Sequence, residues 1–168
     1  MTVILAPLRV EAWATGGLRT GMGARTFEAG GDAVVIAGLC GALDPTLRPG
    51  DLVVASEVRA EGETLLCATD LAELLGARVG PVVSLDHVAG RDEKHALAET
   101  GAVAVDMESF WLARAAGGRP VAVVRAVVDT PDRRLLDPRT VGAGIQGLLA
   151  LRRAAPSLRR WAPLGFYA

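Results

Sequence analysis

The sequence predicts an α/β protein with a central, mostly parallel sheet, because apolar runs of strand length alternate along the chain with helical patterns. The runs are continuous rather than alternating, as expected for strands that are buried on both faces. Glycine- and proline-rich stretches separate them, and no internal repeat or linker divides the chain. We therefore expect one domain over residues 1–168, in which residues 156–168 form a C-terminal tail.

The elements can be placed in order along the chain. The predicted strands, each a short uninterrupted apolar run, are Val3–Leu5, Ala33–Ala37, Leu52–Ala55, Val79–Ser84, Ala102–Val105 and Val121–Val128. The predicted helices, whose apolar residues recur at helical spacing, are Thr69–Leu75, Arg91–Glu99, Ser109–Ala116 and Val141–Ala155. The stretches TGGLRTGMG, DPTLRPGD, AGGRP and DTPD are predicted turns between these elements.

The composition argues against several classes of protein. A net charge of −1 does not favour nucleic acid as the main partner, because such proteins usually have a strong basic excess. The longest apolar run, Ala33 to Leu43, is about half as long as a membrane-spanning helix. The N-terminal stretch MTVILAPLRVEA is interpreted as a first strand rather than a signal peptide, because it lacks an early positive charge.

Cysteine, histidine and lysine are scarce. Cys40 and Cys67 lie far apart, which favours a reducing and therefore cytoplasmic setting. Neither His87 nor His95 has the neighbours of a metal site, so we expect no metal and no cofactor. The single lysine, Lys94, is attributed to compositional bias without functional meaning.

Carboxylates follow three of the predicted strands. Glu11 comes shortly after the first strand, Asp106 and Glu108 follow VAV, and Asp129 directly follows the last strand. Helix caps or solvated turns explain any one of these acids. The carboxyl ends of parallel strands meet at one edge of a sheet, however, so the acids are expected to converge on one crevice. The turn AGLCGAL, at the end of another strand, would let the backbone approach a ligand there.

Carboxyl groups are the chemical tools that this site would use. Burial raises the pKa of one carboxyl while hydrogen bonds lower that of another, so a pair can divide into an acid and a base. Such a pair suits cleavage of a glycosidic bond, in which one group protonates the leaving group and the other activates water.

Several stretches, in one order, resemble the nucleoside phosphorylase and nucleosidase superfamily. VDMESFWLARAA followed by PVAVVRAVVD is similar to its acid–Met–Glu and Arg-Ala-x-x-Asp motifs, and LCGALDPTLRPGDLVVAS to its glycine-rich turn and following strand. GMG at Gly21–Gly23 and Glu11 fall in the expected places. The sequence is most similar to the hopanoid-associated branch, whose members remove adenine from adenosylhopane; relatives are methylthioadenosine/S-adenosylhomocysteine nucleosidases and futalosine hydrolases. The resemblance implies a phosphorylase/hydrolase-like three-layer α/β/α fold with a mixed, mostly parallel sheet.

The resemblance also implies roles for matching residues. Asp129 would be the general acid that protonates the purine at N7, and Glu11 would position the attacking water. Glu108 would bind the ribose hydroxyls beside Met107. The further residues expected to contact the substrate are Val88 and Ala89 in the loop SLDHVA, and Cys40 and Gly41 in the glycine-rich turn.

Structural interpretations apply to other residues. Asp106 is expected to cap a helix, and His87 to be a loop residue satisfied by Asp86. Arg125, inside a strand, is expected to pair with an acid or to extend to solvent. Trp111 is expected to be a core residue, and Met107 suits the core as well as a substrate wall.

Two departures from the superfamily affect the choice of nucleophile and substrate. Phosphorolytic members hold phosphate with Arg and Ser, where this chain has Ile36 and Leu39. Water is therefore favoured over inorganic phosphate, although Arg25 and Arg48 could supply charge. The segment between Ser56 and Val79 is short, which would open the pocket toward a large or apolar 5′ substituent or leave a binding protein without turnover.

The resemblance implies a homodimer, and the C-terminal tail allows a further interpretation. The stretch LLALRRAAPSLRRWAPLGFYA combines four arginines with Trp161 and Phe166. We expect a helix ending near Ala155 and a tail packed on the body. The alternative is weak peripheral contact with an anionic membrane.

Overall fold

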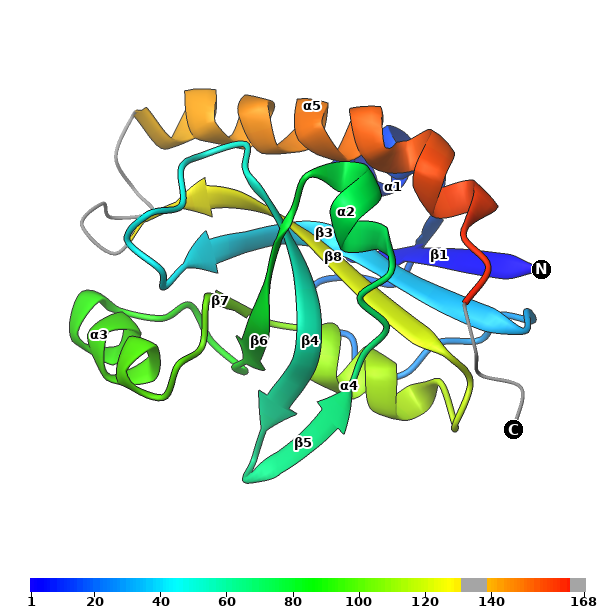
Figure 1. The fold of residues 1–168 in the computed structure, drawn as a ribbon, viewed down its shortest axis with the longest axis horizontal. Coiled ribbons are helices and arrows are strands. Elements are labelled where there is room, and N and C mark those ends of the chain that lie inside the picture. The colour runs from blue at the N-terminus through cyan, green and yellow to red at the C-terminus, as the bar shows by residue number, and fades with distance from the viewer. Residues whose placement is uncertain (131–138, 164–168) are drawn as a thin grey trace.

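The computed structural model describes residues 1–130 and 139–163, in which an eight-stranded mixed sheet has helices on both faces (Figure 1). The strands are β1 (Thr2–Ala6), β2 (Leu18–Arg19), β3 (Ala33–Ala42), β4 (Leu52–Ala60), β5 (Glu63–Leu66), β6 (Arg78–Ser84), β7 (Ala104–Asp106) and β8 (Val121–Asp129). The helices are α1 (Arg9–Thr15), α2 (Leu71–Leu75), α3 (Arg91–Glu99), α4 (Ser109–Ala115) and α5 (Arg139–Arg160).

The sheet is mostly parallel, as predicted, but part of it closes on itself. β3 pairs in parallel with β1 and β8, and β6 pairs in parallel with β4 and β7. β8 pairs antiparallel with β4, and β7 pairs antiparallel with the end of β3. Strands β3, β8, β4, β6 and β7 therefore form a closed ring of pairings. The sequence patterns did not indicate this closure, because they do not show that short β7 joins two distant strands.

Two layers of helices cover the sheet. Helices α1, α2 and α5 pack together on one face, and α4 lies on the other face (Figure 1). On the α5 side, Leu158 and Trp161 pack against Val35 and Val124. On the α4 side, Phe110 belongs to a larger cluster with strands β3, β4 and β8. Burial of these apolar side chains supplies the main driving force for folding.

The predicted strands and helices all occur, with shifted ends, and three further elements appear. Helix α1 and strands β2 and β5 are short. Helix α1 also has no Ser, Thr, Asp or Asn at its N-cap, so the sequence contained no local start signal that predicts this helix. Helix α5 runs to Arg160, and the expected end near Ala155 is wrong because Pro156 is accommodated inside the helix. The predicted turn DTPD falls partly outside the described residues.

The beginning of the tail packs on the body. Trp161 is 7% exposed, its indole N–H donates to Asp70 at 2.9 Å, and Thr2 donates to its carbonyl oxygen at 2.6 Å. These contacts agree with the structural interpretation, in which the tail packs on the body. Phe166 lies outside the described residues. Across residues 1–130 and 139–163, no helix has both the length and the apolar character needed to span a membrane.

Candidate active site

A cavity of about 210 Å³ lies where β1, β3, β7 and β8 end. Its walls include every residue that the sequence assigned to a site: Glu11, Cys40, Gly41, Val88, Ala89, Met107, Glu108 and Asp129. The remaining lining residues include Lys94 and Asp106, together with apolar residues such as Leu8, Met22 and Val128. The structure thus brings together acids that are more than a hundred residues apart in the chain.

The register of the strands explains this convergence. Gly41 of β3 pairs with Asp129 of β8 and, on its other side, with Val105 of β7. Asp129 and the residues after Val105 therefore meet across the end of β3. A β-bulge between Cys40 and Gly41 interrupts the pairing with β8 at the same point. β7 reaches the cavity as an antiparallel neighbour of β3, not as the parallel strand that the pattern indicated.

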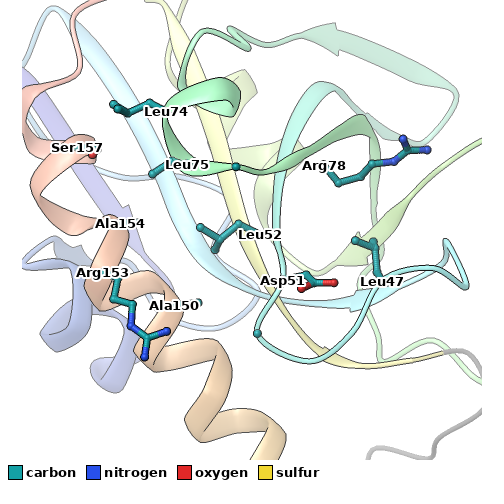
Figure 2. A pocket seen from close by; sticks show the side chains of 12 residues that line it. Leu47, Asp51, Leu52, Leu74, Leu75, Arg78, Ala150, Arg153, Ala154 and Ser157 are labelled. Atoms are coloured by element: carbon teal, nitrogen blue, oxygen red, sulfur yellow. The ribbon is translucent and has the colours of Figure 1, made fainter.

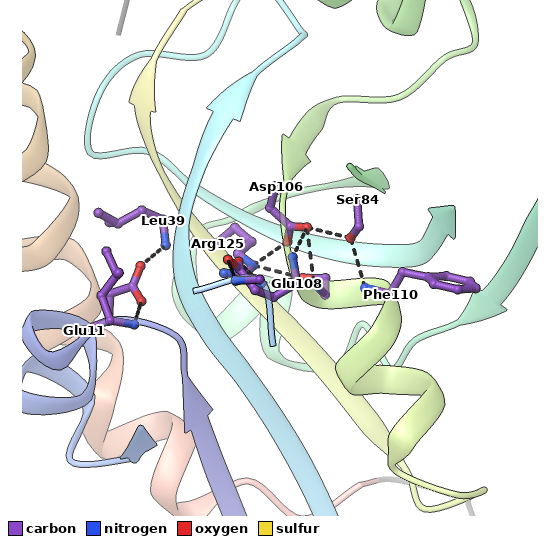
Figure 3. Close-up of polar contacts among 10 residues, drawn as sticks. Glu11, Leu39, Ser84, Asp106, Glu108, Phe110 and Arg125 are labelled. Atoms are coloured by element: carbon purple, nitrogen blue, oxygen red, sulfur yellow. Dashed lines mark hydrogen bonds and ion pairs between the residues drawn. The ribbon is translucent and has the colours of Figure 1, made fainter. Parts of the chain in front are cut away.

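Glu11 projects from α1 toward β3 and is 2% exposed. Its Oε2 accepts the N–H of Leu8 at 2.6 Å, and its Oε1 accepts the N–H of Leu39 at 2.8 Å (Figure 3). Burial raises the pKa of Glu11, while the charge of Arg125 and the two backbone N–H groups lower it less. The carboxyl is therefore fixed in orientation and is a stronger base than a solvated glutamate.

Arg125 is a fully buried cation beneath the cavity, and of the two expected alternatives it pairs with an acid and does not extend to solvent. Its Nε lies 2.7 Å from Asp106 Oδ2, and its Nη2 lies 3.8 Å from Glu108 Oε2 (Figure 3). Nε and Nη2 also donate to Ser109 Oγ at 2.9 and 2.8 Å. Gly38 of β3 makes room for it, because a Cβ there would overlap the guanidinium Nη1. The guanidinium thus compensates several buried carboxylates at once.

Asp106 has the structural role that the sequence indicated, with an ion pair in addition. Its Oδ1 accepts the N–H groups of Glu108 and Ser109, each at 3.2 Å, at the start of α4. Ser84 donates to the same oxygen at 2.6 Å and accepts the N–H of Phe110 at 2.9 Å. These hydrogen bonds therefore connect strand β6, strand β7 and helix α4 directly below Glu108.

Glu108 lies over this network and is 5% exposed. Its Oε1 accepts the N–H of Gly23 at 3.0 Å, which brings the GMG stretch to the cavity. Burial raises the pKa of Glu108, and Arg125 opposes this rise. Met107, next in the chain, is half-buried and lines the cavity, so it forms a wall of the site rather than part of the core.

Lys94 corrects the sequence interpretation, which gave this residue no functional meaning. Its Nζ lies 2.6 Å from Asp129 Oδ2, and both side chains are 5% exposed. Both residues line the cavity. Burial raises the pKa of Asp129, while the hydrogen bond and charge of Lys94 lower it less. Lys94 is the only buried residue of α3, and no local pattern in the sequence indicated this.

Gly41 provides space for this ion pair. A Cβ at this position would lie 2.5 Å from Asp129 Oδ1 and 3.2 Å from Lys94 Nζ. We expect Gly41→Ala to lower the free energy of unfolding by about 1–3 kcal/mol, because the methyl group must displace the carboxylate. Urea unfolding measures this change, with Gly30→Ala as the control, since a Cβ at Gly30 meets nothing within 4 Å. Equal effects of the two substitutions would contradict the conclusion that Gly41 provides space for the Lys94–Asp129 ion pair.

The loop before α3 forms another wall. Val88 and Ala89 line the cavity, and Val88 is half-exposed. His87 is satisfied, as predicted: its Nδ1 lies 2.7 Å from Asp86 Oδ1 and its Nε2 lies 3.0 Å from Glu93. These two acids raise the pKa of His87.

The other cations considered for phosphate lie away from the cavity. The guanidinium of Arg25 stacks 4.6 Å from the centre of the Trp111 ring, and Trp111 itself is buried in the core as predicted. Arg48 donates to the carbonyl oxygens of Pro45 and Leu47. Among the described residues, Lys94 and His87 are the basic residues that line the cavity, beside four carboxylates.

A second hollow, of about 590 Å³, lies between α5, α2 and the start of β4 (Figure 2). It is lined by leucines, by Arg78 and Arg153, and by one carboxylate, Asp51, which accepts the N–H of Arg48 at 2.7 Å. This hollow lacks a pair of convergent carboxyl groups, so the smaller cavity is the candidate active site. Within the described part of the chain, no group of histidine, cysteine or acidic residues has the arrangement of a metal site.

Comparisons with known proteins agree on the fold. Residues 22–146 match the family model of the phosphorylase superfamily. The structure is similar to a 5′-methylthioadenosine/S-adenosylhomocysteine nucleosidase of Helicobacter pylori, with a TM-score of 0.68, 17% identity, and 94% and 95% of the two chains covered. A futalosine hydrolase of the same organism has the same four values. An S-adenosylhomocysteine nucleosidase of Streptococcus pyogenes has a TM-score of 0.66, 20% identity and coverage of 90% and 96%. No curated protein sequence matches the chain.

Proposed function

Because the chain belongs to the phosphorylase superfamily, we propose that its cavity is an active site that cleaves the N-glycosidic bond of a purine nucleoside. The observation that supports this most is the meeting of Glu11, Glu108 and Asp129 around one cavity. The similar solved structures include nucleosidases that act on adenine nucleosides, to judge from their names. In this proposal the substrate is an adenine-type nucleoside.

The proposed roles are those that the resemblance implies, and the geometry of the cavity supports them. Glu11, held by two backbone N–H groups, accepts a proton from the attacking water. Glu108, with its second oxygen facing Arg125, binds the ribose hydroxyls, and Met107 packs on the sugar. Asp129 lies at the end of the cavity, where the leaving base is protonated. Val88, Ala89, Cys40 and Gly41 enclose the base.

Water is the proposed nucleophile. A phosphate dianion needs charge-assisted donors, and the cavity is lined by four carboxylates against Lys94 and His87. Ile36 is completely buried in the sheet, and the N–H of Leu39 donates to Glu11, so it is not available to a phosphate. The electrostatic balance of the described walls therefore opposes a bound phosphate.

The 5′ substituent is proposed to be apolar and large, as in adenosylhopane. Met22 and Val88 line the cavity although they are 70% and 55% exposed, so an aliphatic group could cover them. No described residue from 56 to 79 lines the cavity.

The experiment that tests the function is a release assay without phosphate. The protein is incubated with methylthioadenosine, S-adenosylhomocysteine, inosine and a 5′-alkyl adenosine, and free base is measured by chromatography. We expect adenine to be released without phosphate, and fastest from the 5′-alkyl compound. Strict dependence on phosphate would instead show a phosphorylase, and absence of release from all four would show a binding protein of the same fold.

The rate is expected to fall at acid pH. Glu11 must be ionised to accept a proton, and burial raises its pKa above the ordinary value of 4.5. As the pH falls through this raised pKa, Glu11 becomes protonated and kcat/KM should decline with a midpoint above 4.5. A profile of kcat/KM from weakly acid to neutral pH measures the midpoint. A midpoint below the ordinary value would contradict the role of Glu11.

Assembly and location complete the proposal. We extend it to a cytoplasmic homodimer with weak peripheral membrane contact through residues 156–168. A monomer in sedimentation equilibrium would contradict the dimer. Equal pelleting with anionic liposomes, with and without these residues, would contradict the membrane contact.

The single-domain organisation would be contradicted by two separate unfolding transitions.

A further inference from the structure

The ion pair between α3 and β8 raises a question about the source of the proton. A carboxyl group can protonate a leaving base only when it holds a proton itself. Asp129 Oδ2, however, lies 2.6 Å from the Lys94 ammonium, and its Oδ1 has no hydrogen-bond partner among the described residues. In water an amine holds its proton about six pH units more tightly than an aspartate does. The 2.6 Å separation is that of an ammonium–carboxylate ion pair, in which the nitrogen is the donor.

The position of Lys94 agrees with a role at the base. Helix α3 is otherwise exposed or half-buried, and Lys94 is the single side chain that it buries. A buried ammonium is unfavourable unless it is paired, and Asp129 is its partner. Lys94 has three N–H donors, of which one is used by Asp129; no other partner lies within the described residues. Because Lys94 lines the cavity, its remaining N–H donors are those of a cavity residue.

We propose, on the basis of the function proposed above, that Lys94 is a catalytic residue which supplies the proton to the leaving purine. As the glycosidic C–N bond breaks, its electron pair passes to the base. The Lys94 Nζ–H bond breaks and an N–H bond forms on the base. Lys94 is left as a neutral amine beside the Asp129 carboxylate, while Glu11 takes the proton of the attacking water. Exchange with solvent returns both groups to their starting states.

A substrate whose leaving group departs without being protonated distinguishes a catalytic role of Lys94 from a structural role. Lys94→Arg keeps the positive charge beside Asp129, but a guanidinium does not give up its proton in proteins. We expect Lys94→Arg and Lys94→Met to slow adenine release by at least about 100-fold, with release of p-nitrophenol from p-nitrophenyl riboside changed by less than about threefold. His95→Gln, at an exposed site on the same helix, should leave both rates unchanged.

The two proposals fail in different ways. A wild-type protein that cleaves neither compound would overturn the proposed function and this inference with it. A wild-type protein that releases adenine, with Lys94→Arg variants that slow both compounds equally or neither, would overturn the role of Lys94 alone.

A spectroscopic measurement gives a second readout. Lys94 is the only lysine in the chain, so labelling with ¹⁵Nζ-lysine yields one side-chain resonance. We expect adenine to shift this resonance and 7-deazaadenine, which lacks the N7 atom, to shift it much less. Equal shifts with the two bases, or no shift with either, would contradict contact between Lys94 and N7.

Discussion

Replacing Asp129 with Asn is expected to slow base release by about 100- to 10,000-fold, the usual contribution of general acid catalysis, because protonation of the base depends on the Lys94–Asp129 pair. The substitution removes the carboxylate that holds the Lys94 ammonium 2.6 Å away at the end of the cavity. Asn has the same shape and retains an oxygen that accepts a hydrogen bond from Lys94, so the fold should persist. The loss should therefore appear in kcat more than in KM, because the proton is transferred in the transition state.

The measurement is single-turnover release of adenine from a 5′-substituted adenosine, accompanied by urea unfolding of both proteins. Asp86→Asn provides a control, since Asp86 is an exposed carboxylate that contacts His87 and does not line the cavity. A wild-type rate in Asp129→Asn would remove Asp129 from the reaction and leave the Lys94 pair as a structural contact.

Replacing Arg125 with Met is expected to lower the free energy of unfolding by about 3–5 kcal/mol. The guanidinium is completely buried and lies 2.7 Å from Asp106 Oδ2 and 3.8 Å from Glu108 Oε2. Met fills part of the same volume but leaves these carboxylates without a counter-charge in the interior. Its methyl end also gives Ser109 no hydrogen bond in place of those from Nε and Nη2.

Urea unfolding at neutral pH measures this effect. Arg114→Met is the matched control, because its ion pair with Glu63 at 3.3 Å is exposed and should contribute less than about 1 kcal/mol. The Arg125 variant should also regain stability at acid pH, where Glu108, whose pKa is raised by burial, accepts a proton. A loss no larger than that of the control would show that the buried network adds little to stability.

The strands and the positions of the acids could be predicted because each depends on local pattern. The predicted strand Val121–Val128 is an apolar run followed directly by Asp129, and in the structure β8 extends by that one residue, to Val121–Asp129. Arg125 interrupts that run, and the sequence left two alternatives for it, pairing with an acid or extending to solvent; the structure shows the ion pair with Asp106. The direction and neighbours of β7 were not predictable, since three residues contain no information about which distant strands they join.

Lys94 shows where reasoning from sequence fell short. It lies among charged residues in RDEKHALAE, which is the pattern of a solvated helix. Its burial comes from tertiary contact with Asp129, 35 residues later in the chain. Glu11 was located correctly but for an incomplete reason, because helix α1 and the N–H groups of Leu8 and Leu39 set its orientation. Both residues are fixed by contacts that local spacing does not encode.

A crystal structure with adenine and a ribose analogue bound tests most directly whether one substrate lies among Glu11, Glu108 and Asp129. The account predicts that the base lies between the β8 end and the loop of Val88, with its N7 within about 3.2 Å of the Lys94–Asp129 pair. The sugar hydroxyls should lie on Glu108 and face Glu11. Adenine bound in the second hollow beside α5, or at this cavity with N7 turned away from the pair, would contradict the account.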